Sequence, residues 1–192
     1  MSKIVLASGS PRRQELLNRI GITEFDIRVP EADETYPAGL TPSQVVECIS
    51  RKKADAAAKL CTDDEIVITA DTMVFLDDQR LGKPVDEADA LRMLRLLSDR
   101  THCVISGICV IRGDKTVTAH EVTEVTFAPL SEEIMEKYVD SGEPMDKAGA
   151  YGIQDTASLW ISGIRGDYFN VVGLPVYRLE TTLREQFGLS IW

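Results

Sequence analysis

Two long segments rich in β-branched and apolar residues limit the folds open to this chain more than any other feature. Residues 65–78 (EIVITADTMVFLDD) predict a central strand that runs into a turn, and residues 103–127 predict an antiparallel hairpin around Gly113. Shorter strands are predicted at residues 3–7 and near residues 158–164. A chain with this many strand segments is expected to bury them in a sheet.

Segments with helical periodicity separate these strands. Two of them begin with a cap residue followed by proline, at Ser10-Pro11 and at Thr41-Pro42. The predicted helices span residues 11–20, 41–60, 86–98, 131–142 and about 174–187. Because strands and helices alternate with hairpins mixed in, the sequence predicts an α/β fold, a mixed and partly antiparallel sheet flanked by helices. At this length we expect a single domain over residues 1–192, with room for two lobes.

The balance of charge excludes one class of function. Acidic residues outnumber basic ones by 31 to 21, and the formal net charge of −10 opposes a nucleic-acid-binding surface, which needs a basic field. No apolar run approaches the length of a membrane span, and no export signal is recognised. We therefore expect a cytoplasmic protein whose four cysteines are reduced thiols. With only two histidines, a histidine-rich zinc site is not expected.

Two arginines stand in an unusual place at the start of the first predicted helix. In ASGSPRR (residues 7–13), Arg12 and Arg13 fall in the first turn, where the helix dipole disfavours a cation by roughly 0.3–1 kcal/mol. The chain as a whole repels anions, so a local basic pair is informative. The pattern indicates that this turn binds an anion.

Lys53 and Asp71 are candidates for the chemistry, although each also has an ordinary structural explanation. Lys53 projects within the apolar arc of the predicted helix 41–60, so it either extends its ammonium past the helix rim or points into a polar cleft. The arc consists of Val45, Val46, Ile49, Ala56, Ala57 and Leu60. Asp71 follows the apolar run IVITA, where we expect the strand to emerge into a loop. It is either a turn residue or a working carboxylate.

Two loops offer further charged candidates. Lys83 lies between a glycine and a proline in LGKP, and it is either an exposed loop lysine or a cation held by a constrained backbone. The acidic residues Glu31, Asp33 and Glu34 either form a solvated loop or supply oxygen ligands to a hard cation such as Mg²⁺.

Residues 146–155 (DKAGAYGIQD) form a glycine-bearing loop. Gly149 and Gly152 allow the backbone to approach another group closely, while Tyr151 and Gln154 offer a ring and an amide. A surface loop with glycine turns explains the pattern equally well. The chain has no GxxxxGK[ST] motif and no GxGxxG motif after a strand, so these two phosphate-binding loops are excluded.

Taken in order, these motifs resemble the Maf family of nucleoside triphosphate pyrophosphatases. The resemblance runs through LASGSPRRQELL, ADTMV, LGKP, MLRLLS, SGEPMDKAGAYGIQ and VVGLP, and it covers nearly the whole chain. It implies the Maf and inosine-triphosphatase-like architecture, in which two lobes surround a nucleotide-binding cleft. It also implies a divalent metal, Mg²⁺ or Mn²⁺, and release of pyrophosphate with a nucleoside monophosphate. Asp155 is a departure, because familiar members often carry glycine there.

The resemblance assigns the chemistry to a few residues. Asp71 matches the family's proposed general base, which would orient or deprotonate the attacking water, although the residue could bind the metal instead. Lys53 and Lys83 match functional basic positions and are the other catalytic candidates. Glu34 matches the acidic loop residue and is the candidate metal ligand.

The remaining matches concern the substrate. Arg12, Thr72 and Gln154 match the specificity positions of the branch that acts on dTTP and UTP. Arg13 matches a further basic position, and Ser8 completes the substrate-binding candidates. The Gln154 amide can bond to uracil or to cytosine, whereas Arg12 has only donors and would favour the O4 edge of uracil or thymine.

Three functions stay open on this reasoning. The first is metal-dependent hydrolysis of dTTP and UTP. The others are a nucleotide-sensing regulator of septum formation or cell division, and a pyrophosphatase for a modified nucleotide. The retained carboxylate and lysines favour turnover. We expect a nucleoside triphosphate as the partner and neither a nucleic acid nor a membrane, and a homodimer is left open.

Overall fold

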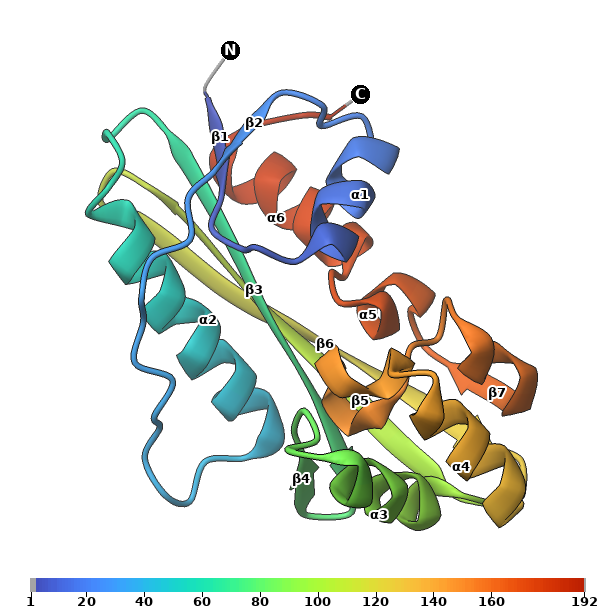
Figure 1. Ribbon diagram of the computed structural model, residues 1–192. Helices are drawn as coiled ribbons and strands as arrows, with labels where there is room; N and C mark the ends of the chain where they lie inside the picture. The colour runs from blue at the N-terminus through green and yellow to red at the C-terminus, as the bar shows by residue number, and fades with distance from the viewer. Residues whose placement is uncertain (1–2, 192) are drawn as a thin grey trace. The chain divides into compact units, whose positions relative to one another are not determined.

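The computed structural model describes residues 3–191 and has the predicted fold class (Figure 1). Within these residues seven strands form a mixed sheet in the order β2-β1-β3-β5-β6-β7, and β4 pairs with β3. The strands are β1 (Ile4–Leu6), β2 (Phe25–Ile27), β3 (Ile66–Leu76), β4 (Gln79–Leu81), β5 (Thr101–Arg112), β6 (Lys115–Phe127) and β7 (Ile161–Arg165). The α-helices are α1 (Pro11–Arg19), α2 (Pro42–Ala58), α3 (Glu87–Leu97), α4 (Glu132–Asp140), α5 (Tyr168–Val172) and α6 (Val176–Phe187). Short 3-10 helices are η1 (Glu143–Asp146), η2 (Ala148–Ala150) and η3 (Thr156–Trp160).

The chain divides into two compact units. Unit 1 contains the described residues up to Asp71, residues 106–121, and the chain from Gly173 onward. Unit 2 contains residues 72–105 and 122–172. Strands β3, β5 and β6 contribute residues to both units. The single-domain organisation and the nucleotide-binding cleft stay predictions.

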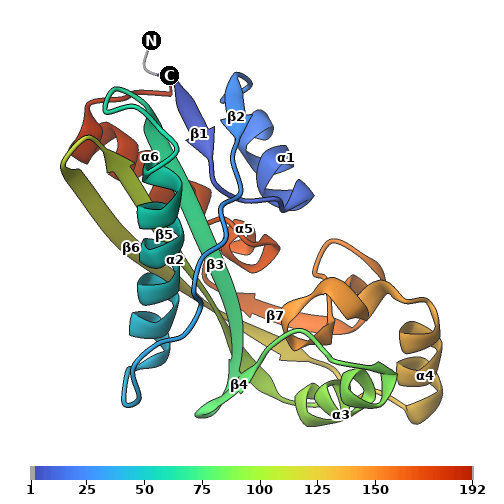
Figure 2. The ribbon, with the colours of Figure 1, turned by 60° about the vertical axis from the view of Figure 1, so that its left-hand side comes forward.

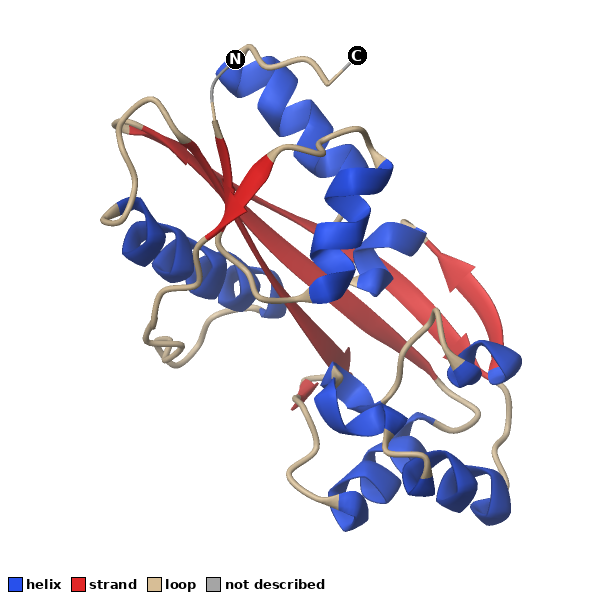
Figure 3. Ribbon diagram, turned by 45° about the horizontal axis from the view of Figure 1, so that its top comes forward, coloured by secondary structure: helices blue, strands red, loops and turns tan. Residues whose placement is uncertain are grey.

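Unit 1 is built on parallel pairing. Strand β1 pairs in parallel with β2 and with β3, so the chain makes two crossovers that contain α1 and α2. The first crossover runs from β1 to β2, and the second runs back past β1 to β3. Because right-handed crossovers in opposite directions place their helices on opposite faces of a sheet, α1 and α2 are expected on different faces. Figure 3 shows this arrangement, with α2 on one face of these strands and α1 with α6 on the other. A buried cluster lies beneath α2, formed by Val5, Ala7, Ala54, Ala57, Val67, Cys109 and Ile111.

Unit 2 places helices α3 and α4 side by side (Figure 2). They pack on an aromatic and aliphatic core that includes Phe127, Tyr138 and Trp160. Helix α5 is attached by Asn170, whose side-chain amide donates to the carbonyl of Val104 and to the Thr123 hydroxyl, each at 2.9 Å.

The differences from the sequence-based expectations are local. Strands β2 and β4 were not expected, because three residues are too few to show alternation. The hairpin of β5 and β6 around Gly113 is confirmed. Leu60 was wrongly assigned to the buried arc of helix 41–60, because α2 ends at Ala58 and Leu60 is 58% exposed.

Helix α2 also differs in which face it buries. The buried positions are Val45, Val46, Ile49, Ser50, Ala54 and Ala57. A capping box starts the helix. The Thr41 hydroxyl accepts a hydrogen bond from the Gln44 backbone N–H, and the Gln44 side-chain oxygen accepts one from the Thr41 backbone N–H. Across residues 3–191, no helix has the length and apolar content that a membrane crossing requires.

Candidate active site

Lys53 joins two carboxylates in unit 1. Its Nζ atom donates to Asp71 Oδ1 at 2.5 Å and lies 3.0 Å from Glu34 Oε1. The Lys53 side chain is only 21% exposed. Of the two interpretations of this lysine, extension past the helix rim is therefore wrong, and the ammonium is held by acidic groups. We call Glu34, Lys53 and Asp71 the Lys53 cluster.

Asp71 lies inside a strand rather than at its end. The expectation that β3 would emerge into a loop at this residue is wrong, because β3 continues through the apolar residues 73–76. The side chain of Asp71 is 12% exposed, and within residues 3–191 its Oδ2 atom is buried without a hydrogen-bond partner. Buried carboxylate oxygens are normally paired, so an unpaired one indicates a position for a water, a proton or a cation.

Arg13 is fixed by two groups of the same unit. Its Nε donates to the carbonyl of Gly173 at 2.8 Å, and its Nη1 donates to Ser8 Oγ at 2.9 Å. Burial lowers the pKa of Arg13, the nearby Asp71 carboxylate opposes this, and the charge of Arg12 lowers the pKa further. The first turn of α1 thus brings Arg13 into electrostatic range of Asp71 and Glu34, with the charge of Arg12 beside it.

Of the two serines before α1, Ser8 makes side-chain hydrogen bonds and Ser10 makes no capping hydrogen bond. Ser10 occupies the N-cap position, but its side chain makes no capping hydrogen bond. Ser8 is buried, and its hydroxyl accepts hydrogen bonds from Arg13 and from the Ser10 backbone at 3.3 Å. In this arrangement Ser8 positions Arg13, and its role in substrate binding stays a prediction.

The acidic loop is attached to α2 by two consecutive lysines. Lys52 Nζ donates to Asp33 Oδ2 at 3.0 Å and to the Thr35 carbonyl at 2.6 Å, while Lys53 holds Glu34. Hydrogen bonds from Thr35, and then from Lys52, lower the pKa of Asp33. Glu34 is thereby presented with an exposed carboxylate next to Asp71.

The donor set fits a metal that arrives with phosphate. In residues 3–191 there is no group of three or more His, Cys, Asp or Glu side chains that could hold a metal ion. Mg²⁺, however, usually binds through one or two carboxylates together with substrate phosphates and waters. Glu34 and the unpaired oxygen of Asp71 are donors of this kind, so these two residues fit the group that the resemblance implies.

The other candidates belong to unit 2. Thr72 follows Asp71 on β3 and is partly buried, whereas Lys83 and Gln154 are exposed in loops. The two loops are joined, because the Gly149 backbone N–H donates to the Gly82 carbonyl at 3.0 Å. Unit 2 therefore brings the segment that carries Lys83 beside the segment that leads to Gln154.

Comparison with known sequences decides the family. The family model described as "Maf-like protein" matches residues 3–186. The chain belongs to the Maf family. A dTTP/UTP pyrophosphatase of Symbiobacterium thermophilum is 50% identical over 192 residues, covering 100% of this chain and 97% of the relative. A dTTP/UTP pyrophosphatase of Bacillus cereus (strain AH820) is 50% identical over 191 residues, covering 100% of this chain and 98% of the relative. Among solved structures, a HAM1 protein of Coxiella burnetii aligns with a TM-score of 0.49 at 17% identity, over 96% of this chain and 100% of that chain.

In this Maf-family chain, the buried residues His102 and Lys147 of unit 2 were not found by sequence reasoning. His102 Nε2 and the Tyr151 hydroxyl are 2.7 Å apart, and both rings are buried. Burial lowers the pKa of His102 to about 4, so the ring is neutral near pH 7. Lys147 is also buried, beneath the loop that carries Gln154. A charged residue within the glycine-rich DKAGAYGIQD motif was a usable signal for Lys147, whereas no signal pointed to His102.

Proposed function

We propose that this chain hydrolyses nucleoside triphosphates, with dTTP and UTP preferred, to the nucleoside monophosphate and pyrophosphate. The observation that carries the proposal is the half-paired carboxylate of Asp71, which Lys53 holds through one oxygen while the other oxygen is buried and unpaired. The relatives named dTTP/UTP pyrophosphatase are 50% identical and match the chain over its full length, which supports this substrate class.

Asp71 acts on water in this proposal. The hydrogen bond from Lys53 fixes the carboxylate, so Oδ2 accepts a proton from a water molecule. The water oxygen forms a bond to the α-phosphorus as the bond from that phosphorus to the bridging oxygen breaks. Pyrophosphate leaves with the bonding electron pair, and the proton passes from Asp71 to solvent.

Positive charge and carboxylates provide the rest of the unit 1 site. Arg12, Arg13 and Lys53 offset the negative charge that builds up on the phosphates. Glu34 would hold a divalent cation, Mg²⁺ or Mn²⁺, and Asp71 Oδ2 would join it only if that oxygen binds the cation instead of acting as the base. When bound, such a cation supplies Lewis-acid polarisation of phosphate oxygens.

We assign Thr72, Lys83 and Gln154 of unit 2 to the nucleotide as well. Lys83 offers a point charge to phosphate, and Gln154 and Thr72 offer hydrogen bonds to the base. The assignment of Gln154 predicts that Gln154→Ala raises KM for UTP by about 10-fold with a small change in kcat, because base contacts are lost while the reacting groups remain.

Pyrophosphate release from a panel of nucleotides tests the proposed function. The panel contains dTTP, UTP, CTP, ATP, GTP and 5-substituted pyrimidine triphosphates, each with Mg²⁺ or Mn²⁺. We expect the highest kcat/KM for dTTP and UTP. Tight binding with no pyrophosphate release would replace the proposal with a nucleotide sensor. A higher kcat/KM for a 5-substituted pyrimidine would replace the substrate with a modified nucleotide.

A further inference from the structure

Lys147 of unit 2 is a buried lysine that the proposed chemistry does not use. Only 10% of its side chain is exposed. Its Nζ atom donates to the carbonyl of Glu143 at 2.6 Å and to Asp146 Oδ1 at 2.8 Å, and it lies 3.6 Å from Asp155 Oδ2. A lysine is rarely buried without a partner that stabilises its charge, and here the partners lie on both sides of the loop that it supports.

The stem of Lys147 passes directly under the backbone of Gly152. A Cβ atom at position 152 would lie 2.7 Å from Lys147 Cε and 2.4 Å from Asp155 Oδ2, so no other residue fits without moving the lysine or the carboxylate. Asp155 itself has φ −104°, which any residue can adopt. The departure from the glycine of familiar members therefore introduces no strain and adds a partner for the buried ammonium.

The turn above Lys147 presents Gln154. The Asp155 backbone N–H donates to the Gly152 carbonyl at 3.2 Å, which closes a four-residue turn. Within this turn the side chain of Ile153 is buried, and Gln154 is exposed. The buried neighbour fixes the direction in which the turn projects the amide.

Both ends of the turn are also held by other side chains. The Gly152 N–H donates to the Tyr138 hydroxyl at 3.3 Å. Beyond the turn, the Thr156 N–H and hydroxyl donate to the two carboxylate oxygens of Glu143, at 3.1 Å and 2.9 Å. The carbonyl of that same Glu143 accepts from Lys147, so the lysine connects the start of the loop with its end.

We propose that Lys147 is a positioning residue, which fixes the turn that carries Gln154 and so sets the affinity and selectivity for the base. The assignment rests on the proposed function, in which Gln154 contacts the base. Lys147 touches neither substrate nor the reacting atoms. Loss of its charge frees the Asp155 carboxylate to turn toward water and draws the turn away from its position. Binding then has to order the loop again, which weakens nucleotide affinity without altering the chemical step.

The test is Lys147→Met, which keeps the buried stem and removes the charge. Its matched control is Lys137→Met, at a lysine of the same unit that is 74% exposed and paired with Glu133. We expect Lys147→Met to raise KM for UTP and dTTP by about 10-fold, with kcat within about 3-fold of the parent, and to reduce selectivity against CTP. Asp155→Asn in the Lys147→Met background should recover part of the lost affinity, because the unpaired charge is removed. The folded fraction of each variant is measured by thermal unfolding and active-site titration.

The outcomes separate the two proposals. A parent protein that turns over no pyrimidine triphosphate would overturn the proposed function and this assignment with it. An active parent whose Lys147→Met variant keeps the KM and selectivity of the Lys137→Met control would overturn the assignment alone. A variant in which kcat falls in proportion to the folded fraction, with KM unchanged, would show that Lys147 supports only stability. Asp155→Asn in the parent is measured in parallel as a variant that keeps the lysine, and it should raise KM by a smaller factor.

Discussion

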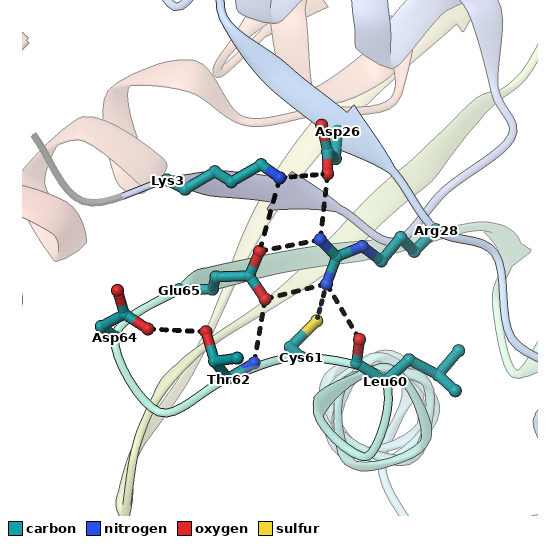
Figure 4. A network of polar contacts seen from close by, with 8 residues as sticks. All are labelled: Lys3, Asp26, Arg28, Leu60, Cys61, Thr62, Asp64 and Glu65. Atoms are coloured by element: carbon teal, nitrogen blue, oxygen red, sulfur yellow. Dashed lines mark hydrogen bonds and ion pairs between the residues drawn. The ribbon is translucent and has the colours of Figure 1, made fainter.

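Unit 1 holds two clusters of charged side chains, each built around a largely buried carboxylate, and they differ in how completely that carboxylate is paired. In the cluster drawn in Figure 4, which we call the Arg28 cluster, both oxygens of Glu65 are bonded to the Arg28 guanidinium, at 2.7 Å and 2.8 Å. The Thr62 N–H adds a third hydrogen bond at 2.9 Å, and Arg28 also donates to Asp26 at 2.9 Å. Lys3 completes the cluster through an ion pair with Asp26 at 2.7 Å.

The Lys53 cluster also joins a basic side chain to two carboxylates, but it leaves one carboxylate oxygen unpaired. Lys53 bonds to one oxygen of Asp71, while the other oxygen is buried without a partner in the described chain. Burial does not explain the contrast, because the carboxylate side chains are similarly exposed, 8% for Glu65 and 12% for Asp71. The difference lies in the number of donors around each carboxylate.

This contrast separates a structural carboxylate from a working one. A carboxylate with every oxygen paired contributes to stability and binds a proton less readily, because its hydrogen bonds favour the charged form. A buried carboxylate with an unpaired oxygen costs stability, and such costs concentrate at functional sites. The Arg28 cluster connects β1, β2 and the segment that leads into β3, whereas we propose that the Lys53 cluster takes part in the reaction.

The largest expected effect comes from removing the charge of each carboxylate in turn. Asp71→Asn should lower kcat by about 10²-fold or more, because a general base or a metal-binding oxygen is lost. Glu65→Gln should leave the kcat of the folded protein unchanged. Pyrophosphate release at saturating dTTP, corrected for folded fraction, is the measurement. Near-normal turnover by Asp71→Asn would remove both roles of Asp71.

The second effect concerns the metal. Glu34→Gln should weaken Mn²⁺ binding by about 10-fold, because a two-carboxylate set loses one of its charges. Glu31→Gln, in the same acidic loop, is the matched control and should bind as the parent does. Electron paramagnetic resonance of Mn²⁺ with a non-hydrolysable nucleotide measures binding independently of turnover. Equal affinities in the two variants would mean that Glu34 is not a ligand.

The sequence indicated Glu34, Lys53 and Asp71 as candidate residues, but it did not predict that they lie together. Asp71 was selected because ligands gather where a strand of an α/β sheet is expected to end, and Lys53 because a lysine within an apolar arc can point into a polar cleft. Their contact could not be predicted, because it depends on the pairing of β1 with β3 and on the face of the sheet that α2 covers. The same limit explains the error at Asp71, where the apolar residues on both sides belong to one continuous strand.

The sequence analysis missed residues whose side chains bond to other side chains of the folded protein. Arg28 and Glu65 are 37 positions apart, and nothing in the local sequence marks them as partners. His102 is bonded in the same way to Tyr151, 49 positions along the chain, whereas Lys147 was missed although its partners Glu143, Asp146 and Asp155 are near it in the sequence. The alternation of strands and helices was predictable because it is a local periodicity, whereas these networks exist only once the chain is folded.

The third prediction measures the structural cluster by its stability. Arg28→Met keeps an apolar stem but removes the donors to Glu65, to Asp26 and to the Leu60 carbonyl. We expect Tm to fall by a few degrees, because paired acceptors become unsatisfied. The kcat of the folded protein should stay within twofold of the parent. A large loss of kcat at unchanged Tm would show that the Arg28 cluster serves the reaction, and the contrast with the Lys53 cluster would fail.

The smallest effect is the pH dependence of the Arg28 cluster. Hydrogen bonds from Arg28 and from the Thr62 backbone lower the pKa of Glu65 from 4.5 to about 2. Because the folded protein binds this proton less tightly than the unfolded chain does, the stability from Glu65 is fully present above pH 4.5 and is lost as the pH falls toward 2. Glu65→Gln lacks this contribution at every pH, so its Tm should lie a few degrees below that of the parent at pH 6.

The gap in Tm between the parent and Glu65→Gln should then narrow between pH 4.5 and pH 2. Asp26 also has a lowered pKa, through Lys3 and Arg28, but it is present in both proteins and cancels in the difference. Thermal unfolding of the two proteins from pH 6 to pH 2.5 is the measurement. A gap that stays constant over this range would mean that Glu65 stabilises unit 1 through packing rather than charge. The number of hydrogen-bond donors around Glu65 would then not explain how the Arg28 cluster stabilises the fold.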